Sequence, residues 1–283
     1  MQVSIRPMGI KDIPQGYRLS SLAGWNQSVN DWHWLLNAGN GGCFVAYSGE
    51  VILGTVTSIT YAGKISWIGM VLVDPDFRKM GIGTRLVKTA VQYSLTNSRQ
   101  VYLDATPQGS QLYIRLGFQP IVRLQRLVLE HKEAKRTKFL ECKSLLSDLS
   151  KEVVAFDEKV YGANREPLIK YLLEGYPQLA WYISKKHKLT GLCLGRQGRL
   201  YTHIGPLEAV DEDCARILVL QVVSQAGNRD VILDIFEANQ TWLQWLLSNG
   251  FIYQRPFIRM SLEAQTDFGL PSRRYASAGP EFG

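Results

Sequence analysis

The stretch of sequence that decides the fold is Met70-Val-Leu-Val-Asp-Pro-Asp-Phe-Arg-Lys-Met-Gly-Ile-Gly-Thr84. Its apolar start predicts a β-strand, and the apolar residues from Gly81 to about Asn97 fall on one face of a helix. Gly81 and Gly83 let the backbone approach a ligand closely. The free amides and the positive dipole end at a helix start attract anions. The stretch therefore predicts an anion-binding loop.

The side chains of this loop suit a phosphate group. Arg78 and Lys79 add positive charge, and the hydroxyl of Thr84 can donate a hydrogen bond to a phosphate oxygen. A dinucleotide fingerprint would need a third glycine where Leu86 stands, and the stretch lacks the Gly-Lys-Ser/Thr of a Walker loop. The alternative to an anion site is an ordinary strand-to-helix turn, which two glycines and a basic pair would also fit.

The loop lies within a mixed α/β pattern of helical and strand periodicity. The predicted elements around it are a strand at 3–6, helices at 11–22 and 29–36, strands at 43–47, 51–61 and 65–73, a strand at 101–103, a helix at 107–116 and a strand at 118–129. The three strands before the loop are separated by short glycine-containing turns, so they predict an antiparallel meander.

Composition indicates an ordinary folded protein of 283 residues with 46% hydrophobic residues and a net charge of +7. Residues 1–135 hold 14 basic and 8 acidic residues, so most of the positive excess lies in the first half. A phosphorylated cofactor suffices to explain this excess, and no basic stripe with interleaved aromatics favours nucleic acid. No long apolar run or signal-peptide layout occurs, so we expect no membrane association and a cytoplasmic location. The scattered cysteines and histidines predict no metal site.

The run Val73-x-Pro75-x-x-Arg78-x-x-Gly81-x-Gly83 resembles the acetyl-CoA signature of the GCN5-related N-acetyltransferases (GNAT). Leu103-Asp-Ala105 and Leu112-Tyr-x-x-x-Gly-Phe118 follow at suitable distances, and the resemblance covers residues 1 to about 130. It implies an α/β (α+β) fold with a mixed, mostly antiparallel, splayed sheet flanked by helices. It also implies acetyl-CoA as co-substrate and an enzyme that transfers the acetyl group directly to an amine.

The resemblance assigns the donor residues. The main chain of Val71, Leu72 and Val73 would pair with the pantetheine arm. The pyrophosphate would lie beneath Arg78 on the amides of Lys79, Met80, Gly81, Ile82, Gly83 and Thr84.

The resemblance gives Tyr113 the role of the acid that protonates the departing thiolate, and a phenol with a pKa of about 10 suits that step. A helix tyrosine that packs on the core is the alternative. Histone-type members carry a glutamate that acts as the general base eleven residues before the loop arginine, but Trp67 occupies that position here. Asp104 is the nearest carboxylate by motif, although it could instead cap backbone amides, and deprotonation through water is a further route.

The acceptor side of the family is built by the first two helices and the meander. Trp25 and Trp32 could form the wall of a pocket for an ammonium group, and Asn26 could supply a polar contact. Tryptophans at these positions could equally belong to the core. The acceptor could be a small molecule or a peptide, and the protein a monomer or a homodimer.

The second half repeats the order of elements and predicts a degenerate copy of the same fold. His203-Ile-Gly-Pro206 aligns with Leu72-Val-Asp-Pro75, but Asp211-Glu-Asp213 replaces the loop glycines and would repel a pyrophosphate. Leu246 stands where the first half has Tyr113. We expect this half to close the acceptor cleft without doing chemistry.

The predicted organisation is a catalytic domain at 1–130, a basic linker at 131–139, the degenerate domain at 140–265 and a flexible tail at 266–283. A CoA-binding sensor or scaffold without turnover is the alternative function.

Overall fold

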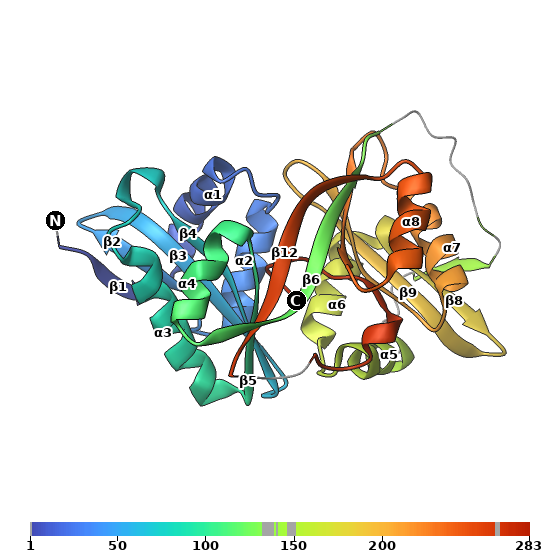
Figure 1. The fold of residues 1–283 in the computed structure, drawn as a ribbon, viewed down its shortest axis with the longest axis horizontal. Helices are drawn as coiled ribbons and strands as arrows, with labels where there is room; N and C mark the ends of the chain where they lie inside the picture. Colours follow the sequence, from blue (N-terminus) through green and yellow to red (C-terminus); the bar gives the residue numbers. More distant parts are fainter. Residues whose placement is uncertain (1, 132–138, 140, 146–150, 264–266) are drawn as a thin grey trace. The chain divides into compact units, whose positions relative to one another are not determined.

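A computed structural model describes residues 2–131, 139, 141–145, 151–263 and 267–283 of the chain, which form two compact units (Figure 1). The first unit comprises the described residues of 1–119, together with 260–263 and 282. The second comprises the described residues of 120–259, 267–281 and 283. Each unit is a mixed α/β fold with an open, mostly antiparallel sheet flanked by helices, as the sequence predicts.

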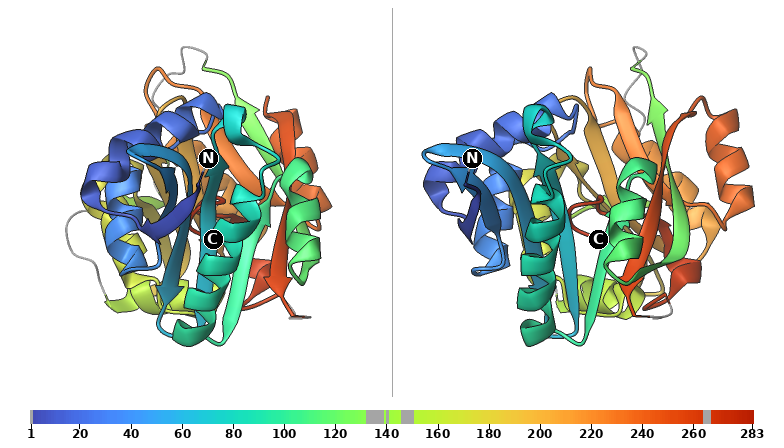
Figure 2. Two further views of the ribbon diagram at one scale, coloured as in Figure 1. Left: turned by 90° about the vertical axis from the view of Figure 1, so that its left-hand side faces the viewer. Right: turned by 60° about the vertical axis from the view of Figure 1, so that its left-hand side comes forward.

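The first unit follows the predicted order of elements closely. Its elements are β1 (Ser4–Pro7), α1 (Ile13–Leu22), α2 (Val29–Gly39), β2 (Phe44–Ser48), β3 (Val51–Tyr61), β4 (Ile65–Val73), α3 (Ile82–Asn97), β5 (Gln100–Ala105) and α4 (Pro107–Arg115). The strands lie in the order β1-β2-β3-β4-β5, and only the β4–β5 pair is parallel. Helices α1 and α2 lie on one face of this sheet, and α3 and α4 lie on the other (Figure 2).

Helices cover both faces of the sheet at β3, so side chains that point in alternate directions along this strand are nearly all buried. Ser58 hydrogen-bonds Ser94 of α3 at 2.8 Å between their hydroxyls, so the even-numbered residues of β3 face α3. The odd-numbered residues face α1 and α2. Trp67 on β4 is opposite Ile59 and therefore shares this second face.

The second unit contains elements that correspond to those of the first, together with two long strands at one end of its sheet path and a short strand off that path. Its elements are β6 (Phe118–Leu129), β7 (Cys142–Ser144), α5 (Lys151–Tyr161), α6 (Glu166–Gly175), β8 (Trp181–Lys185), β9 (Lys188–Gln197), β10 (Thr202–Ala209), α7 (Glu212–Val223), β11 (Val231–Phe236), α8 (Gln240–Ser248), β12 (Ile252–Leu262) and β13 (Arg274–Ala276). The strands lie in the order β12-β6-β11-β10-β9-β8-β7, and β13 pairs with β10. A buried apolar cluster that includes Leu218, Leu233 and Trp242 forms its core.

The domain boundaries differ from the predicted ones because the two units exchange segments. Residues 120–129, predicted to end the first domain, group with the second unit, where β6 pairs antiparallel with β11. Residues 260–263 at the end of β12 group with the first unit. Strand pairing depends on backbone hydrogen bonds between segments that are distant in sequence, and local sequence patterns do not reveal these partners. Most of the predicted linker, residues 132–138, lies outside the described residues.

The tail that the sequence predicts to be flexible is instead packed into the fold. Tyr275 and Ala276 are buried in β13, and Phe282 is fully buried. The Phe282 carbonyl accepts a hydrogen bond from Tyr61 Oη at 2.7 Å, and its ring packs edge-on against Trp34. The glycine- and serine-rich composition was misleading because small residues also allow close backbone packing. Within the described residues, no helix is long and apolar enough to cross a membrane.

Candidate active site

The candidate donor site lies where strands β4 and β5 of the first unit separate. They pair in parallel only from Ile65 opposite Gln100 to Trp67 opposite Tyr102. Beyond this point β4 contains a bulge at Met70, whose φ is 48°, and Thr55 Oγ1 donates a hydrogen bond to the Met70 carbonyl at 2.8 Å.

Leu72 and Val73 therefore pair with β3 on one edge, and residues 71–73 lie beyond the segment of β4 that pairs with β5. Val71 and Val73 are half-buried, whereas Leu72 is buried. These residues form the edge that we expect to meet a pantetheine arm.

The predicted anion loop leads directly into α3. Gly81 is the N-cap residue with a φ of 76°, and no side chain caps the helix amides there. A Cβ added at Gly81 would meet no atom within 4 Å, so open space lies in front of the loop. At Gly83 an added Cβ would make ordinary contacts of 3.6 Å with Leu112 and Val73. The glycines thus leave room for a ligand rather than relieve a clash inside the protein.

The basic residues of the loop are available to an anion. Arg78 and Lys79 are exposed, and Arg78 Nε lies 3.4 Å from the Val73 carbonyl oxygen. Lys79 has a φ of 63°, a backbone conformation that turns the chain between the strand and the helix.

Tyr113 lies on α4, whose start is capped by the Thr106 hydroxyl. Its ring packs edge-to-face against Phe118 at 5.9 Å between centroids, and the side chain is 8% exposed. Burial raises the pKa of Tyr113 well above its ordinary value of 10. The phenol therefore stays protonated at neutral pH and can act as a proton donor but not as a base.

Asp104 lies on β5, two residues past Tyr102, where the two parallel strands have separated. It is half-buried. Trp67, at the position of the family glutamate, is fully buried and stacks on Tyr102 at 6.3 Å between centroids. An aromatic pair thus fills the place where histone-type members hold a base.

The three expected acceptor residues have different environments. Trp32 is fully buried, its Nε1 donates to Ser20 Oγ at 3.2 Å, and its ring lies against Gly16. Trp32 therefore joins α1 to α2 in the core, and we leave it out of the acceptor site. Trp25 is half-buried and Asn26 is buried, both in the loop between these helices.

Two further residues on this side were missed by sequence reasoning. Gln27 and Thr57 are buried, and neither Gln27 Oε1 nor Thr57 Oγ1 has a hydrogen-bond partner among the described residues. Buried polar atoms without partners are uncommon and costly, so each is a candidate contact for a polar ligand. Thr57 is one of several hydroxyl residues in β3, so its sequence context does not single it out, whereas Gln27 lies in the loop between α1 and α2 beside Asn26.

The equivalent opening in the second unit is filled by the chain itself. Strands β10 and β11 pair in parallel only at residues 202–203 and 231–232, and β13 then pairs with β10, with Leu207 opposite Ala276. Ser277 N donates to the Asp234 carbonyl of β11 at 2.9 Å. A Cβ at Gly205 would lie 1.9 Å from the Ser277 carbonyl oxygen, so this close approach requires glycine. We call residues 274–277 the tail plug.

The helix start beside the plug is closed as well. Asp211 caps α7 by accepting from Cys214 N at 2.8 Å, and Glu212 Oε2 accepts from Thr241 Oγ1 of α8 at 2.6 Å. The alignment of Pro206 with Pro75 proves wrong, because Pro206 lies inside β10 at its register shift. The cap residues Gly81 and Asp211 correspond instead, which leaves the contrast between a glycine and an acidic helix start intact.

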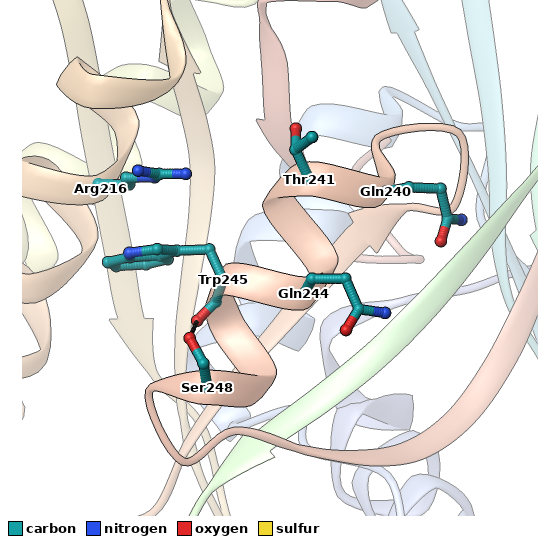
Figure 3. Close-up of a pocket in the computed structure, with 6 residues that line it drawn as sticks. All are labelled: Arg216, Gln240, Thr241, Gln244, Trp245 and Ser248. Carbon is teal, nitrogen blue, oxygen red and sulfur yellow. Dashed lines mark hydrogen bonds between the residues drawn. The ribbon is translucent and has the colours of Figure 1, made fainter.

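A surface hollow of about 480 Å³ lies along α8 in the second unit. Its lining residues are Arg216, Gln240, Thr241, Gln244, Trp245 and Ser248 (Figure 3). The Arg216 guanidinium lies over the Trp245 ring at 5.4 Å, and Trp242 stacks on that ring at 5.3 Å. Gln244 points away from this group. The indole of Trp245 is therefore already engaged by two side chains of its own unit.

Comparison with known proteins agrees with this geometry. The sequence profile described as "Acetyltransferase (GNAT) family" matches residues 13–118, and the one described as "Acetyltransferase (GNAT) domain" matches residues 153–269. The chain belongs to the GCN5-related N-acetyltransferase superfamily. It is a tandem GNAT protein and an acyltransferase.

Two curated relatives match most of the chain at low identity, and a third matches a shorter part of it. The holothin acyltransferase of Pseudoalteromonas sp. is 23% identical over 80% of this chain and 76% of its own length. The Bacillus subtilis N-acetyltransferase YitH is 24% identical over 83% of this chain and 82% of its own length. N-alpha-acetyltransferase 30 of Dictyostelium discoideum is 30% identical over 41% of this chain and 61% of its own length.

Solved structures share the fold of the whole chain. A candidate acetyltransferase from Pyrococcus horikoshii has a TM-score of 0.84 at 21% identity and covers 99% of this chain and 96% of its own. A tandem GNAT protein from the clavulanic acid biosynthesis pathway has a TM-score of 0.64 at 12% identity and covers 93% and 99%, respectively.

Proposed function

We propose that the first unit transfers an acetyl group from acetyl-CoA directly to an amine acceptor. The observation that carries the proposal is the uncapped glycine start of α3, which lies at the end of an open strand edge in the same unit as Tyr113. In this proposal the amides from Lys79 to Thr84 bind the pyrophosphate beneath Arg78. The main chain of residues 71–73 orients the pantetheine arm.

The proposed reaction is a single displacement at the thioester carbonyl. The neutral amine attacks the carbonyl carbon, the new C–N bond forms, and the C–S bond breaks. Tyr113 gives its proton to the departing thiolate of CoA. Before attack, the ammonium form of the acceptor loses one proton to Asp104 or to water, because an amine with a pKa near 10 is mostly protonated at neutral pH. After the C–N bond forms, the nitrogen loses a second proton to the same acceptors, and the Tyr113 phenolate takes a proton back from solvent.

We propose that the second unit binds no donor. Its strand opening holds the tail plug, and its helix start carries Asp211 and Glu212, whose charges oppose a pyrophosphate. The full chain should therefore bind one CoA molecule.

The proposed acceptor is a small molecule or a peptide with a free amino group. Trp25 and Asn26, in the loop between α1 and α2, would contact it. One relative is named as a holothin acyltransferase and another as an N-alpha-acetyltransferase. These names support an amine acceptor and do not favour a small molecule over a peptide.

The test combines calorimetry with an assay of thiol release. The purified full chain is titrated with CoA and then incubated with acetyl-CoA and a panel of amines. One CoA per chain and amine-dependent thiol release support the proposal. Two molecules per chain would refute the proposal that the second unit binds no donor. Undiminished affinity in Gly83→Glu would refute the donor site of the first unit, since a carboxylate would then occupy it without effect.

A further inference from the structure

The ion pair between Arg18 and Asp74 joins helix α1 to the first residue of the donor loop. Arg18 Nη2 lies 2.8 Å from Asp74 Oδ2, and Arg18 Nε donates to Gln15 Oε1 at 2.8 Å. Two contacts thus orient the guanidinium. Asp74 is only 8% exposed, and its other oxygen accepts a hydrogen bond from Asp76 N at 3.2 Å. A buried carboxylate therefore stands where the strand turns into the loop.

The charges within the loop cancel one another. Residues 74–84 contain the acids Asp74 and Asp76 and the bases Arg78 and Lys79, so the segment by itself has no formal charge. A carboxylate near a pyrophosphate opposes its binding unless a cation neutralises it. Arg18 brings such a cation from a different element and gives the assembled loop a net charge of +1.

We propose that Arg18 is a positioning residue of the donor site, which neutralises Asp74 so that the loop accepts the phosphates of acyl-CoA. This inference rests on the proposed function. Arg18 acts through Asp74 and needs no contact with the donor. Its effect should therefore depend on ionic strength and on the phosphates of the donor, and it should disappear when the carboxylate is removed.

The test is a double-mutant cycle in the full chain, with CoA affinity measured by calorimetry at low salt and at high salt. We expect Arg18→Ala to raise the Kd of CoA about 3- to 10-fold at low salt and less at high salt. In the background of Asp74→Asn, the same change should have no effect. Asparagine keeps the oxygen that accepts from Asp76 N, so the turn is preserved.

A matched control is available in the same unit. Arg6 pairs with Asp12 at 2.6 Å with side-chain exposures of 42% and 9%, against 40% and 11% for Arg18 and Asp74. Arg6→Ala should leave the Kd of CoA unchanged. Arg18→Ala should also leave the KM of S-acetylpantetheine unchanged, because this donor lacks phosphates.

Several results would overturn the inference. They are an unaltered Kd of CoA in Arg18→Ala, an equal loss with both donors, an equal loss in Arg6→Ala, or a loss that persists with Asp74→Asn. Arg18→Lys keeps the charge and should keep most of the affinity for CoA. If Arg18→Ala does not fold, a large loss of CoA affinity in a folded Arg18→Lys would contradict the inference. A wild-type chain that binds no CoA would instead refute the proposed function.

Discussion

The side chain of Tyr113 combines burial with a place on the helix next to the donor opening. Desolvation disfavours the phenolate, which raises the pKa and keeps the proton on the oxygen. No described residue hydrogen-bonds the Tyr113 hydroxyl. In the proposed reaction, this protonated hydroxyl is the group that would donate to the departing thiolate.

Replacing Tyr113 by Phe should lower kcat about ten- to a thousandfold and leave the Kd of CoA nearly unchanged, because only the proton transfer is lost. Steady-state kinetics and calorimetry measure the two effects. Tyr93→Phe is the control, since Tyr93 Oη donates to the Asn40 carbonyl at 2.8 Å, outside the donor loop. Normal turnover in Tyr113→Phe would assign Tyr113 to packing.

His203 is a buried histidine of the second unit. Burial, aided by Arg196 and Arg126, lowers its pKa from 6.5 to about 3 despite the nearby Asp234 carboxylate. Between these values the unfolded chain binds a proton that the folded chain does not, so stability falls as the pH is lowered from about 6.5 toward 3.

Denaturant titrations at pH 4 to 7 should show this slope, at most ~1.4 kcal/mol per pH unit from His203. His203→Gln should flatten the slope whatever its effect on absolute stability. His187→Gln, at an exposed position, should retain it. An equal slope in the wild type and both variants would show that groups other than His203 cause the loss of stability at low pH.

At the scale of elements, the two units differ most at the start of corresponding helices. Helix α3 begins at an uncapped glycine with open space before it, whereas α7 begins at Asp211, which caps its own first turn. The first arrangement leaves amides for a ligand, and the second satisfies them within the chain.

Substituting Asp211, Glu212 and Asp213 together by Ala should therefore leave the Kd of CoA unchanged. The loss of the cap and of favourable dipole interactions should lower the free energy of unfolding by about 1 kcal/mol. Calorimetry and thermal denaturation measure these two quantities. The appearance of a second CoA site would mean that the acids, and not the tail plug, keep the donor out.

At the scale of the whole molecule, the two compact units do not coincide with the two halves of the sequence. The first unit takes residues 260–263 from the second half, and the second unit takes 120–129 from the first. A chain ending near residue 135 would lack residues 260–263 of the first unit and hold only a single strand of the second.

A chain truncated after residue 135 would keep β6 without β11, with the apolar residues Leu127 and Val128 deprived of their partners. We expect it to unfold without a cooperative transition and to bind CoA at least tenfold more weakly than the full chain. Circular dichroism during heating and calorimetry test this. A cooperative, fully CoA-competent fragment would show that the exchanged segments are dispensable.

The sequence by itself determined the glycine loop of the first unit and the acidic helix start of the second. The strand, the glycines and the helix between Met70 and Asn97 follow one another along the chain, so their chemistry is local and readable. The acidic start of α7 was equally readable. Only the tertiary structure decided that the tail plugs the second unit, that Trp32 belongs to the core and that Arg18 neutralises Asp74. These features join residues distant along the chain through backbone hydrogen bonds, burial and charge, and no local pattern records which distant segment will meet which.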